Sequence, residues 1–452
     1  MKKKAALHNL GCKVNAYETE AMRQLLEEDG YEIVPFEPGA DVYVINTCSV
    51  TNIADRKSRQ MLHKARKMNA DAIVIAAGCY VETADGEAEK DPAIDIVLGN
   101  NQKKMLIQVI RDFEQKRAEN REESTTGALT KKIDINHTKE YENLVIDRTE
   151  NRTRADIKVQ DGCNQFCTYC IIPFARGRVR SRDTQDVLNE VRALAASGCQ
   201  EVVLTGIHLS SYGVDLDEKT DLISLIEAVH EVDGISRIRL GSLEPGIVTE
   251  KFADTLAALP KVCPHFHLSL QSGCDTVLKR MNRRYTSGEF KEKCELLRRA
   301  FVNPALTTDV IVGFPGETEE EFAQTEAFLR EIQLYETHIF KYSKRQGTKA
   351  AVMPNQVPES VKSVRSERLI ALGNENRRYF EEKYLGKEVE VLFEEKNTIN
   401  GQEYFTGYTK EYIRVAVLAD RDYTNETLRG VLQEGAAEHI YSLKGCFTEE
   451  QK

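Results

Sequence analysis

The sequence contains no tryptophan among its 452 residues, so any stacking on a planar ligand must come from tyrosine, phenylalanine, histidine or arginine. No stretch approaches the ~20 consecutive apolar residues that span a membrane. The basic start, Met-Lys-Lys-Lys, is not followed by the apolar run of a signal peptide. These absences predict a cytoplasmic protein that has no membrane partner.

The eleven cysteines are an odd number in a chain without a signal peptide, which argues against a disulfide framework and for metal ligands or reactive thiols. The formal net charge of −10 argues against a nucleic acid partner, although RNA contact needs only a local basic surface. The composition, 41% hydrophobic and 30% charged, is that of a globular protein, and the length predicts about three domains.

Three of the cysteines fall within one short segment, Cys163-Asn-Gln-Phe-Cys167-Thr-Tyr-Cys170. No regular helix or strand places all three on one face, but a loop can wrap them around one small group. Thiolates select zinc, copper(I) or iron–sulfur clusters. A closed structural zinc site needs a fourth ligand, commonly from a second Cys pair, and no second C-x-x-C follows. Three ligands with an open fourth position favour a 4Fe-4S cluster that binds a further molecule.

This loop, with Tyr169 before its last cysteine, resembles the radical S-adenosylmethionine (radical SAM) enzymes. Its flanks, Val159–Gly162 and Ile171–Arg178, are similar to the methylthiotransferases of that superfamily. The resemblance implies that the three cysteines bind a catalytic 4Fe-4S cluster on which SAM is reductively cleaved. The resulting 5′-deoxyadenosyl radical would abstract hydrogen from C2 of an adenine, and a second SAM would supply the methyl group.

Residues 1–110 alternate strand and helix signals. Strands are expected at Lys4–Leu10, Asp41–Asn46 and Ala72–Ala77, with a helix at Glu18–Glu28 and a long basic helix at about Ile53–Met68. This pattern predicts an α/β domain whose parallel sheet carries helices on both faces. We expect a flavodoxin-like domain that ends near residue 110.

Cys12, Cys48 and Cys79 each follow one of these three strands. The carboxyl ends of parallel strands share one edge, so the three thiols should converge there. Spacing alone leaves open that they are unreactive buried thiols. The family resemblance implies that they hold a second 4Fe-4S cluster, which carries or activates the sulfur that is inserted.

Residues 111–150 are strongly polar, and Gln115–Thr126 has almost no large apolar side chain. This composition predicts a solvated linker with a helical start, and an RNA-contacting arm is the alternative.

Residues 151–375 repeat strand and helix six times. The expected strands are Ile157–Gln160, Glu201–Gly206, Ser236–Leu240, Phe266–Leu270, Thr308–Gly313 and Tyr335–Tyr342. Six units are too few for a closed eight-stranded barrel and suit the open, partial (β/α)6 TIM-like barrel that the resemblance implies. The Cys163 loop follows the first strand, at the carboxyl face where barrel chemistry occurs.

Several strand ends in this segment also resemble the family, in which such positions hold the methionine, ribose and adenine parts of SAM. A carboxylate and polar groups are chemically suited to an amine and ribose hydroxyls. The predicted cofactor contacts are Tyr169, Gly206, Glu244, Gln271 and Asp309.

Residues 376–441 show short alternating strands with glycine turns, which predict a small all-β barrel. Its position resembles the TRAM domain, a small RNA-binding module, and residues 442–452 are expected to form a tail. The remaining cysteines show no grouping and are read as ordinary thiols: Cys199, Cys263, Cys274, Cys294 and Cys446.

Basic residues gather beyond the predicted strand ends. Four arginines alternate just after the cysteine loop and are the predicted RNA contacts: Arg176, Arg178, Arg180 and Arg182. Two further sets lie at 279–284 and 341–349. Because arginine can pair with phosphate and stack on an unpaired base, these sets predict one RNA-binding rim.

The resemblance implies methylthiolation of an adenine beside the anticodon, with a tRNA anticodon stem-loop as partner. The run Gln160–Cys167 is similar to the threonylcarbamoyladenosine enzymes, and the Met-Tyr-Gly typical of isopentenyladenosine enzymes is absent. Two alternatives keep the same chemistry but change the substrate, to isopentenyladenosine of tRNA or to an aspartate of a ribosomal protein. A third alternative is a non-catalytic iron–sulfur RNA-binding protein. The reaction also implies an electron donor, such as flavodoxin or ferredoxin, and a sulfur source.

Overall fold

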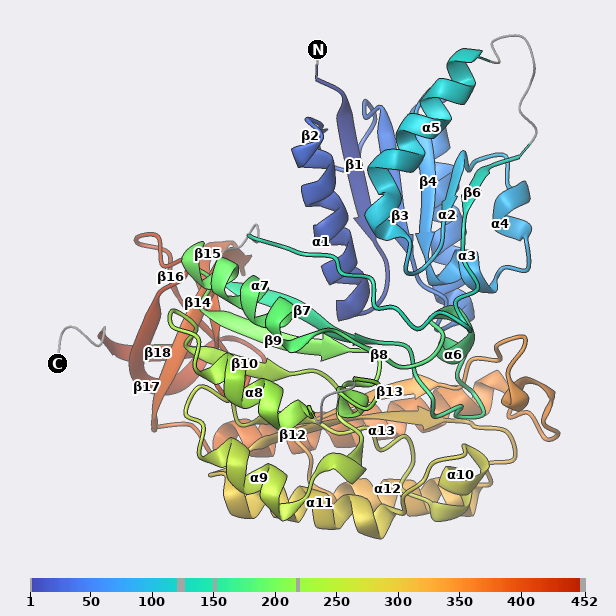
Figure 1. Cartoon of the computed structure of the whole chain (residues 1–452). Coiled ribbons are helices and arrows are strands. Elements are labelled where there is room, and N and C mark those ends of the chain that lie inside the picture. Colours follow the sequence, from blue (N-terminus) through green and yellow to red (C-terminus); the bar gives the residue numbers. More distant parts are fainter. Residues whose placement is uncertain (1, 120–126, 149–152, 217–219, 448–452) are drawn as a thin grey trace.

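The computed structural model describes residues 2–119, 127–148, 153–216 and 220–447 of the chain (Figure 1). An α/β sheet domain, a partial parallel barrel and a small closed β-barrel follow one another along the sequence. This arrangement confirms the predicted fold class. None of the helices within the described residues is long and apolar enough to cross a membrane.

The N-terminal sheet is parallel throughout, and its order β2-β1-β3-β4-β5-β6 contains the flavodoxin-like order. Its strands are β1 (Lys4–Asn9), β2 (Glu32–Ile33), β3 (Val42–Thr47), β4 (Ile73–Gly78), β5 (Ile96–Leu98) and β6 (Leu129–Lys131). The side chains of β3 and β4 are buried on both faces because helices cover both sides of the sheet.

Helices α1 (Lys13–Glu28) and α5 (Leu106–Glu119) cover one face of this sheet. Helices α2 (Asn52–Met68), α3 (Cys79–Thr83) and α4 (Glu87–Lys90) cover the other. Each long helix turns an apolar stripe toward the sheet, as with Met22 and Leu26 of α1 and Leu62 and Ala65 of α2. The basic helix expected at about 53–68 is therefore α2.

The predicted domain end at residue 110 is wrong, because it falls inside α5, and β6 completes the sheet only later in the chain. The predicted linker has the expected helical start, since α5 runs to Glu119, but part of it is not solvated. Leu144 and Ile146 are buried in the core of the next domain. Residues 120–126, 149 and 150, which the linker prediction also included, lie outside the described residues.

The central domain is an open barrel that confirms the six expected strands: β7 (Arg154–Asp161), β9 (Glu201–Gly206), β10 (Arg237–Leu240), β11 (His265–His267), β12 (Ala305–Val312) and β13 (Glu336–Lys341). A short strand, β8 (Arg180–Ser181), runs antiparallel to β7. Two sheets, β10-β9-β7-β8 and β11-β12-β13, are joined by parallel bridges, among them Ile238 to Val262 and Leu243 to Leu268.

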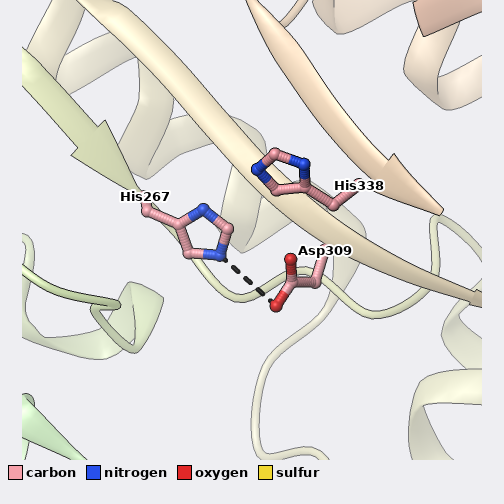
Figure 2. A group of neighbouring side chains, drawn as sticks. All are labelled: His267, Asp309 and His338. Atoms are coloured by element: carbon pink, nitrogen blue, oxygen red, sulfur yellow. Dashed lines mark ion pairs between the residues drawn. The ribbon is translucent and has the colours of Figure 1, made fainter. Parts of the chain in front are cut away.

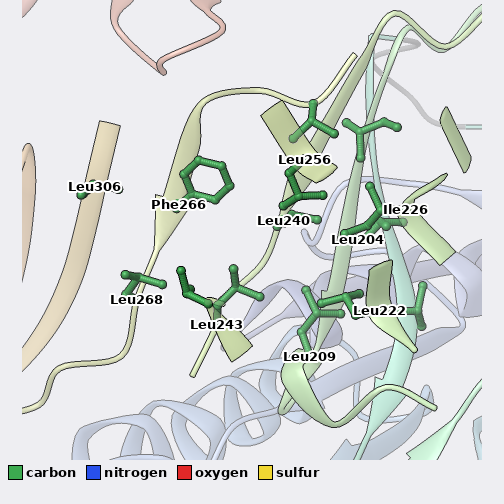
Figure 3. Packing of buried hydrophobic residues seen from close by; sticks show 14 of the residues in the cluster. Leu204, Leu209, Leu222, Ile226, Leu240, Leu243, Leu256, Phe266, Leu268 and Leu306 are labelled. Atoms are coloured by element: carbon green, nitrogen blue, oxygen red, sulfur yellow. The ribbon is translucent and has the colours of Figure 1, made fainter. Parts of the chain in front are cut away.

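The long helices of this domain pack against the outside of the barrel: α7 (Thr184–Ala196), α8 (Leu222–His230), α9 (Glu250–Ala257), α11 (Ser287–Ala300), α12 (Glu319–Ile332) and α13 (Glu359–Glu382). Two short helices, α6 (Ile172–Ala175) and α10 (Asp275–Arg280), lie in the loops after β7 and β11. Figure 3 shows part of the apolar layer between strands and helices, with Leu204, Leu240 and Phe266 facing Leu222 and Leu256.

The C-terminal domain is a closed barrel of β14 (Glu388–Ile399), β15 (Gln402–Thr409), β16 (Arg414–Leu418), β17 (Thr427–Ala437) and β18 (Ile440–Phe447). The predicted tail at 442–452 is wrong in its first part, since β18 closes the barrel; residues 448–452 lie outside the described residues. Arg237 and Arg239, on β10, donate to the carbonyl oxygens of Tyr408, Thr409 and Lys410. This barrel therefore lies against the amino ends of the central strands.

Candidate active site

The cysteine loop turns sharply as it leaves β7. Gly162 has a φ of 71°, and a Cβ added there would lie 1.8 Å from the Arg178 carbonyl oxygen, so only glycine fits. The Cys163 amide donates to the Gly177 carbonyl at 3.0 Å, and the Cys170 amide donates to the Cys167 carbonyl at 3.0 Å. These bonds fold the loop back on itself and hold the three thiols together.

Protein surrounds the thiols of this loop. Burial raises the pKa of Cys163 to about 11 and the pKa of Cys170 to about 12. Arg283 donates through Nη1 to Cys167 Sγ at 3.2 Å, so a fixed positive charge faces the group. Thiols that resist ionisation alone ionise when a metal replaces their protons. Three such thiols beside a counter-charge fit a 4Fe-4S cluster.

Three of the five predicted cofactor residues, Tyr169, Gln271 and Asp309, line one cavity of about 230 Å³. Val50 and Thr51, which follow Cys48 closely in the chain, line its other side. The cavity therefore lies between the N-terminal sheet domain and the barrel. The segment after Cys48 thus faces the barrel strand ends that lie beside the Cys163 loop.

The other two predicted cofactor residues lie outside that cavity. Glu244 accepts a hydrogen bond from Arg283 Nη2 at 2.9 Å and faces His208 Nε2 at 3.6 Å. Burial alone would raise the pKa of Glu244, but the contact with His208 and the charge of Arg283 keep it below its ordinary value. A Cβ added at Gly206 would lie 2.9 Å from Gln160 Oε1, so the glycine leaves room for the Gln160 side chain.

The inside of the barrel carries a polar group beside this cavity. Figure 2 shows His267, Asp309 and His338 on three neighbouring strands with their polar atoms turned toward one another, and those atoms lie within 4.8 Å. Thr307 Oγ1 lies 3.0 Å from His267 Nδ1, while His267 Nε2 lies 3.5 Å from Asp309 Oδ2. The barrel interior here can form hydrogen bonds to a ligand, unlike a packed apolar core.

The three cysteines of the N-terminal domain lie at adjacent strand ends, as predicted. Cys12 precedes α1, Cys48 follows β3 and Cys79 begins α3 directly after β4. A Cβ added at Gly11 would lie 3.1 Å from Cys48 Sγ, so the two segments approach closely. Asn15 Nδ2 donates to the carbonyls of Leu10 at 2.7 Å and Thr47 at 2.9 Å and joins two of these strand ends.

Local charges bear on this second triplet. Burial raises the pKa of Cys12, although the Arg176 guanidinium lowers it in part, and burial raises the pKa of Cys48 to about 11. The proximity of Cys79 raises both further. Three mutually close thiols with a glycine at the closest approach fit a cluster. Cys12 keeps contact with solvent although protein surrounds its thiol, so the site has an opening.

A fully buried ionic network connects the two cysteine triplets. Glu18 of α1 accepts from Arg176 at 2.8 Å and from Lys158 at 2.8 Å, and it pairs with Lys103 at 3.0 Å. Asp161 pairs with Lys158 at 2.6 Å and with Arg176 at 3.2 Å. The sequence analysis did not identify Glu18 or the role of Arg283. Glu18 could have been found because it is an acidic residue on the apolar face of a predicted helix.

The predicted RNA contacts after the loop need correction. Three of the four arginines, Arg176, Arg180 and Arg182, are 0–1% exposed in their side chains. Arg180 pairs with Asp161 at 3.6 Å, and Arg182 pairs with Glu190. They cannot grip phosphates, because carboxylates already enclose them. Arg178 is half-buried over the Phe166 ring, 4.5 Å from its centroid, and its contact with RNA stays a prediction.

The two other basic sets are also partly used within the protein. Arg280 pairs with Glu321 at 2.6 Å, Arg283 pairs with Glu244 at 2.9 Å, and Arg345 pairs with Asp55 at 2.7 Å. Arg345 thereby joins the barrel to the first turn of α2. Exposed cations of these sets include Lys279, Arg284, Lys344 and Lys349.

Two family models match the chain: residues 157–329 match the radical SAM superfamily, and residues 4–99 match a family described as uncharacterized protein family UPF0004. The solved radical S-adenosylmethionine methyltransferase TsrM from Kitasatospora setae, with cobalamin and a [4Fe-4S] cluster bound, resembles it with a TM-score of 0.56. That similarity covers 78% of this chain and 77% of TsrM at 17% identity. In fold and in its cysteine loop, the chain is a radical SAM protein.

The chain is 42% identical to threonylcarbamoyladenosine tRNA methylthiotransferase MtaB of Bacillus subtilis, over 94% of this chain and 92% of the relative. It is 38% identical to MtaB of Aquifex aeolicus, over 92% and 98%. A tRNA-2-methylthio-N(6)-dimethylallyladenosine synthase of Finegoldia magna is 33% identical, over 91% and 88%. The chain belongs to the radical SAM methylthiotransferase family, and membership implies a 4Fe-4S cluster and SAM as cofactors.

Proposed function

We propose that the chain methylthiolates tRNA at C2 of the N6-threonylcarbamoyladenosine next to the anticodon. The observation that carries the proposal is the cavity between the N-terminal sheet domain and the barrel, with Tyr169, Gln271 and Asp309 on one side and Val50 and Thr51 on the other. The names of the two MtaB relatives support this substrate over the dimethylallyl one.

In this proposal Cys163, Cys167 and Cys170 hold the catalytic cluster, and Arg283 offsets their negative charge by its bond to Cys167 Sγ. Glu244, which accepts a hydrogen bond from the same Arg283 that contacts Cys167 Sγ, is proposed to accept the SAM amine. The other predicted cofactor residues line or shape the space for the rest of SAM. The bound cluster and SAM supply a carbon-centred radical that can remove an unactivated hydrogen.

Cys12, Cys48 and Cys79 are proposed to hold the second 4Fe-4S cluster, where sulfur for insertion is bound. Arg176 contributes a buried positive charge close to Cys12. Its bonds to Glu18 and Asp161 fix that charge in place.

The substrate base must leave its stack to reach a site this deep, which costs least for an adenine in a single-stranded loop. His267, Asp309 and His338 give the barrel interior hydrogen-bonding groups for a base and its polar threonylcarbamoyl group. An apolar isopentenyl group offers no hydrogen-bonding atoms to these side chains. A flavodoxin or ferredoxin as electron donor and a separate sulfur source complete the reaction.

Mass spectrometry of tRNA nucleosides from cells that lack this chain tests the substrate. We expect 2-methylthio-N6-threonylcarbamoyladenosine to disappear and its unmodified precursor to accumulate, while 2-methylthio-isopentenyladenosine stays constant. Loss of the isopentenyl product instead would support the other nucleoside. No change in any tRNA nucleoside would favour the ribosomal-protein substrate or the non-catalytic alternative.

Iron and sulfide analysis of anaerobically reconstituted protein tests the two clusters. We expect about eight irons per chain, because each cysteine triplet can hold one 4Fe-4S cluster. The Cys163→Ala/Cys167→Ala/Cys170→Ala variant should retain about four. Loss of all iron from a folded variant, or no loss, would contradict two independent sites.

A further inference from the structure

Helix α2 carries an unusual surface for a protein of net charge −10. Arg56, Lys57, Lys64 and Lys67 are all exposed, and none of these four cations has an anionic partner among the residues that the structure describes. The opposite side of the helix, with Leu62 and Ala65, packs against the sheet. The four charges are therefore not neutralised within the described part of the domain.

The unneutralised cations form one stripe. At 100° per residue, Arg56, Lys57, Lys64 and Lys67 fall within an arc of about 100° that faces away from the buried side, over a length of about 16 Å. On the neighbouring flank His63 faces Asp91 at 2.9 Å, Arg66 pairs with Asp95, and Arg59 lies over the Tyr80 ring. Other protein groups thus contact the cations on one flank of α2. The cationic row beside that flank consists of Arg56, Lys57, Lys64 and Lys67. Within the row, Lys64 lies 6.0 Å from the Phe36 ring centroid, which leaves its charge without an anion among the described residues.

The row begins at the candidate active site. Val50 and Thr51, directly before α2, line the cavity of about 230 Å³ that also contains Tyr169, Gln271 and Asp309. The first residue of α2, Asn52, is bound to the barrel through Ser343 Oγ at 3.1 Å and the Lys344 carbonyl at 3.0 Å. These bonds fix the amino-terminal end of α2 against the barrel segment that contains the exposed Lys344.

We propose that this cationic row is the docking surface for the double-stranded stem of the substrate RNA, with the stem backbone lying along α2. The inference rests on the proposed function. A base from the loop would enter the cavity at the amino-terminal end of α2, and the stem would extend from there past Lys64 and Lys67. Because side chains cannot read the deep major groove of an RNA helix, these contacts are to phosphates.

Exposed apolar side chains beside the cavity fit this arrangement. Val50 is 50% exposed, Ile53 is 58% exposed and Phe340, on the barrel side, is 48% exposed. They lie where the stem ends and unpaired bases begin, and an unstacked base can bury apolar surface against them. The stem-binding row and the loop-binding edge are thus continuous.

The test compares a charge-removing variant with a matched control in the reconstituted holoprotein. The variant is Arg56→Gln/Lys57→Gln/Lys64→Gln/Lys67→Gln. The control, Lys116→Gln/Arg192→Gln/Lys251→Gln/Arg299→Gln, removes the same charge from exposed positions on α5, α7, α9 and α11. A second variant, Lys64→Gln/Lys67→Gln, keeps the test informative if four changes impair folding.

Affinity is measured against salt for a tRNA anticodon stem-loop and for a single-stranded RNA of the loop alone. For the stem-loop, we expect the salt slope of the α2 variant to fall by about three units, a little under one per phosphate contact, and the affinity at low salt to fall at least about tenfold. The double variant should show about half the change in slope. The control should match wild type, and all proteins should bind the loop RNA alike.

Four results would overturn the inference. The first is an α2 variant that binds the stem-loop like the control. The second is an equal loss of affinity for the loop RNA, which would mean that the single-stranded loop binds to α2. The third is unchanged RNA binding with slower reduction by flavodoxin, which would make α2 the docking surface for an acidic electron donor. The last, wild-type protein that binds no tRNA, refutes the proposed function as well, whereas the first three leave it standing.

Discussion

Glu18 is the residue whose loss should most directly test how the two halves of the site are held together. It lies on α1 of the sheet domain and is fully buried, and its partners Arg176 and Lys158 belong to the barrel. Glu18→Gln keeps the shape but removes the charge. Asp161 then remains as the ion-pair partner of Arg176 and Lys158, while Lys103 loses its pair with Glu18.

The expected magnitude follows from burial. Removing one partner of a buried ion pair costs about 3–5 kcal/mol, because the opposite charge stays buried without compensation. At about 2 °C per kcal/mol for a large chain, Tm should fall by about 6–10 °C. Glu331→Gln is the matched control: its pair with Lys291 is exposed, so its loss should leave Tm nearly unchanged.

The assay is calorimetric or circular-dichroism melting of both variants, together with hydrogen exchange of α1 and β7. Burial alone would raise the pKa of Glu18, but Arg176, Lys103 and Lys158 hold it well below its ordinary value of 4.5. The stabilisation is therefore fully present above pH 4.5 and is lost as the pH falls through the lower folded pKa. The difference in Tm from wild type should be constant from about pH 6 to 8 and shrink in acid. A Tm within about 1 °C of the Glu331→Gln control would refute the reasoning.

Three further predictions concern the site and its supports. The Cys12→Ala/Cys48→Ala/Cys79→Ala variant should still form 5′-deoxyadenosine from SAM but no methylthio product, and a folded variant that forms neither would contradict separate roles for the two triplets. Arg182→Gln should destabilise by about 3 kcal/mol in denaturant unfolding and Arg178→Gln by less than about 1 kcal/mol, since Arg182 has a buried anionic partner and Arg178 is half-buried over a ring; equal effects would contradict this. Glu201→Gln should lower Tm at neutral pH, because Arg239, Arg154 and Arg237 outweigh burial and lower the pKa of Glu201 to about 2. That contribution is present above pH 4.5 and lost as the pH falls toward 2, so melting at low pH should no longer separate the variant from wild type.

The cysteine loop and the six barrel strands could be predicted from the sequence because their signals are local. Strands buried on both faces are continuous apolar runs, as in β3 and β4, and a residue directly after such a strand must lie at the carboxyl edge of the sheet. That rule alone places Cys12, Cys48 and Cys79 at neighbouring strand ends. Cys163, Cys167 and Cys170 lie in one loop, so their spacing alone was enough to group them.

The use of each charge was decided by tertiary structure. Composition does not distinguish Arg176 from Lys64 in the sequence, since the segment after the cysteine loop and α2 are both basic. Arg176 is buried because Glu18, 158 residues earlier in the chain, closes over it. Lys64 has no such anionic partner among the described residues and stays exposed.

Local sequence thus determined the barrel strands, the long helices and the positions of the two cysteine triplets, because each depends on neighbours within a few residues, whereas the short strands β6 and β8 were not predicted. Tertiary structure decided that Arg176, Arg180 and Arg182 stabilise the junction instead of facing RNA, and that the unneutralised cations lie on α2 beside the cavity. The physical reason is that burying a charge requires a counter-charge within a few ångströms, and which distant segment supplies it is set only when the domains pack.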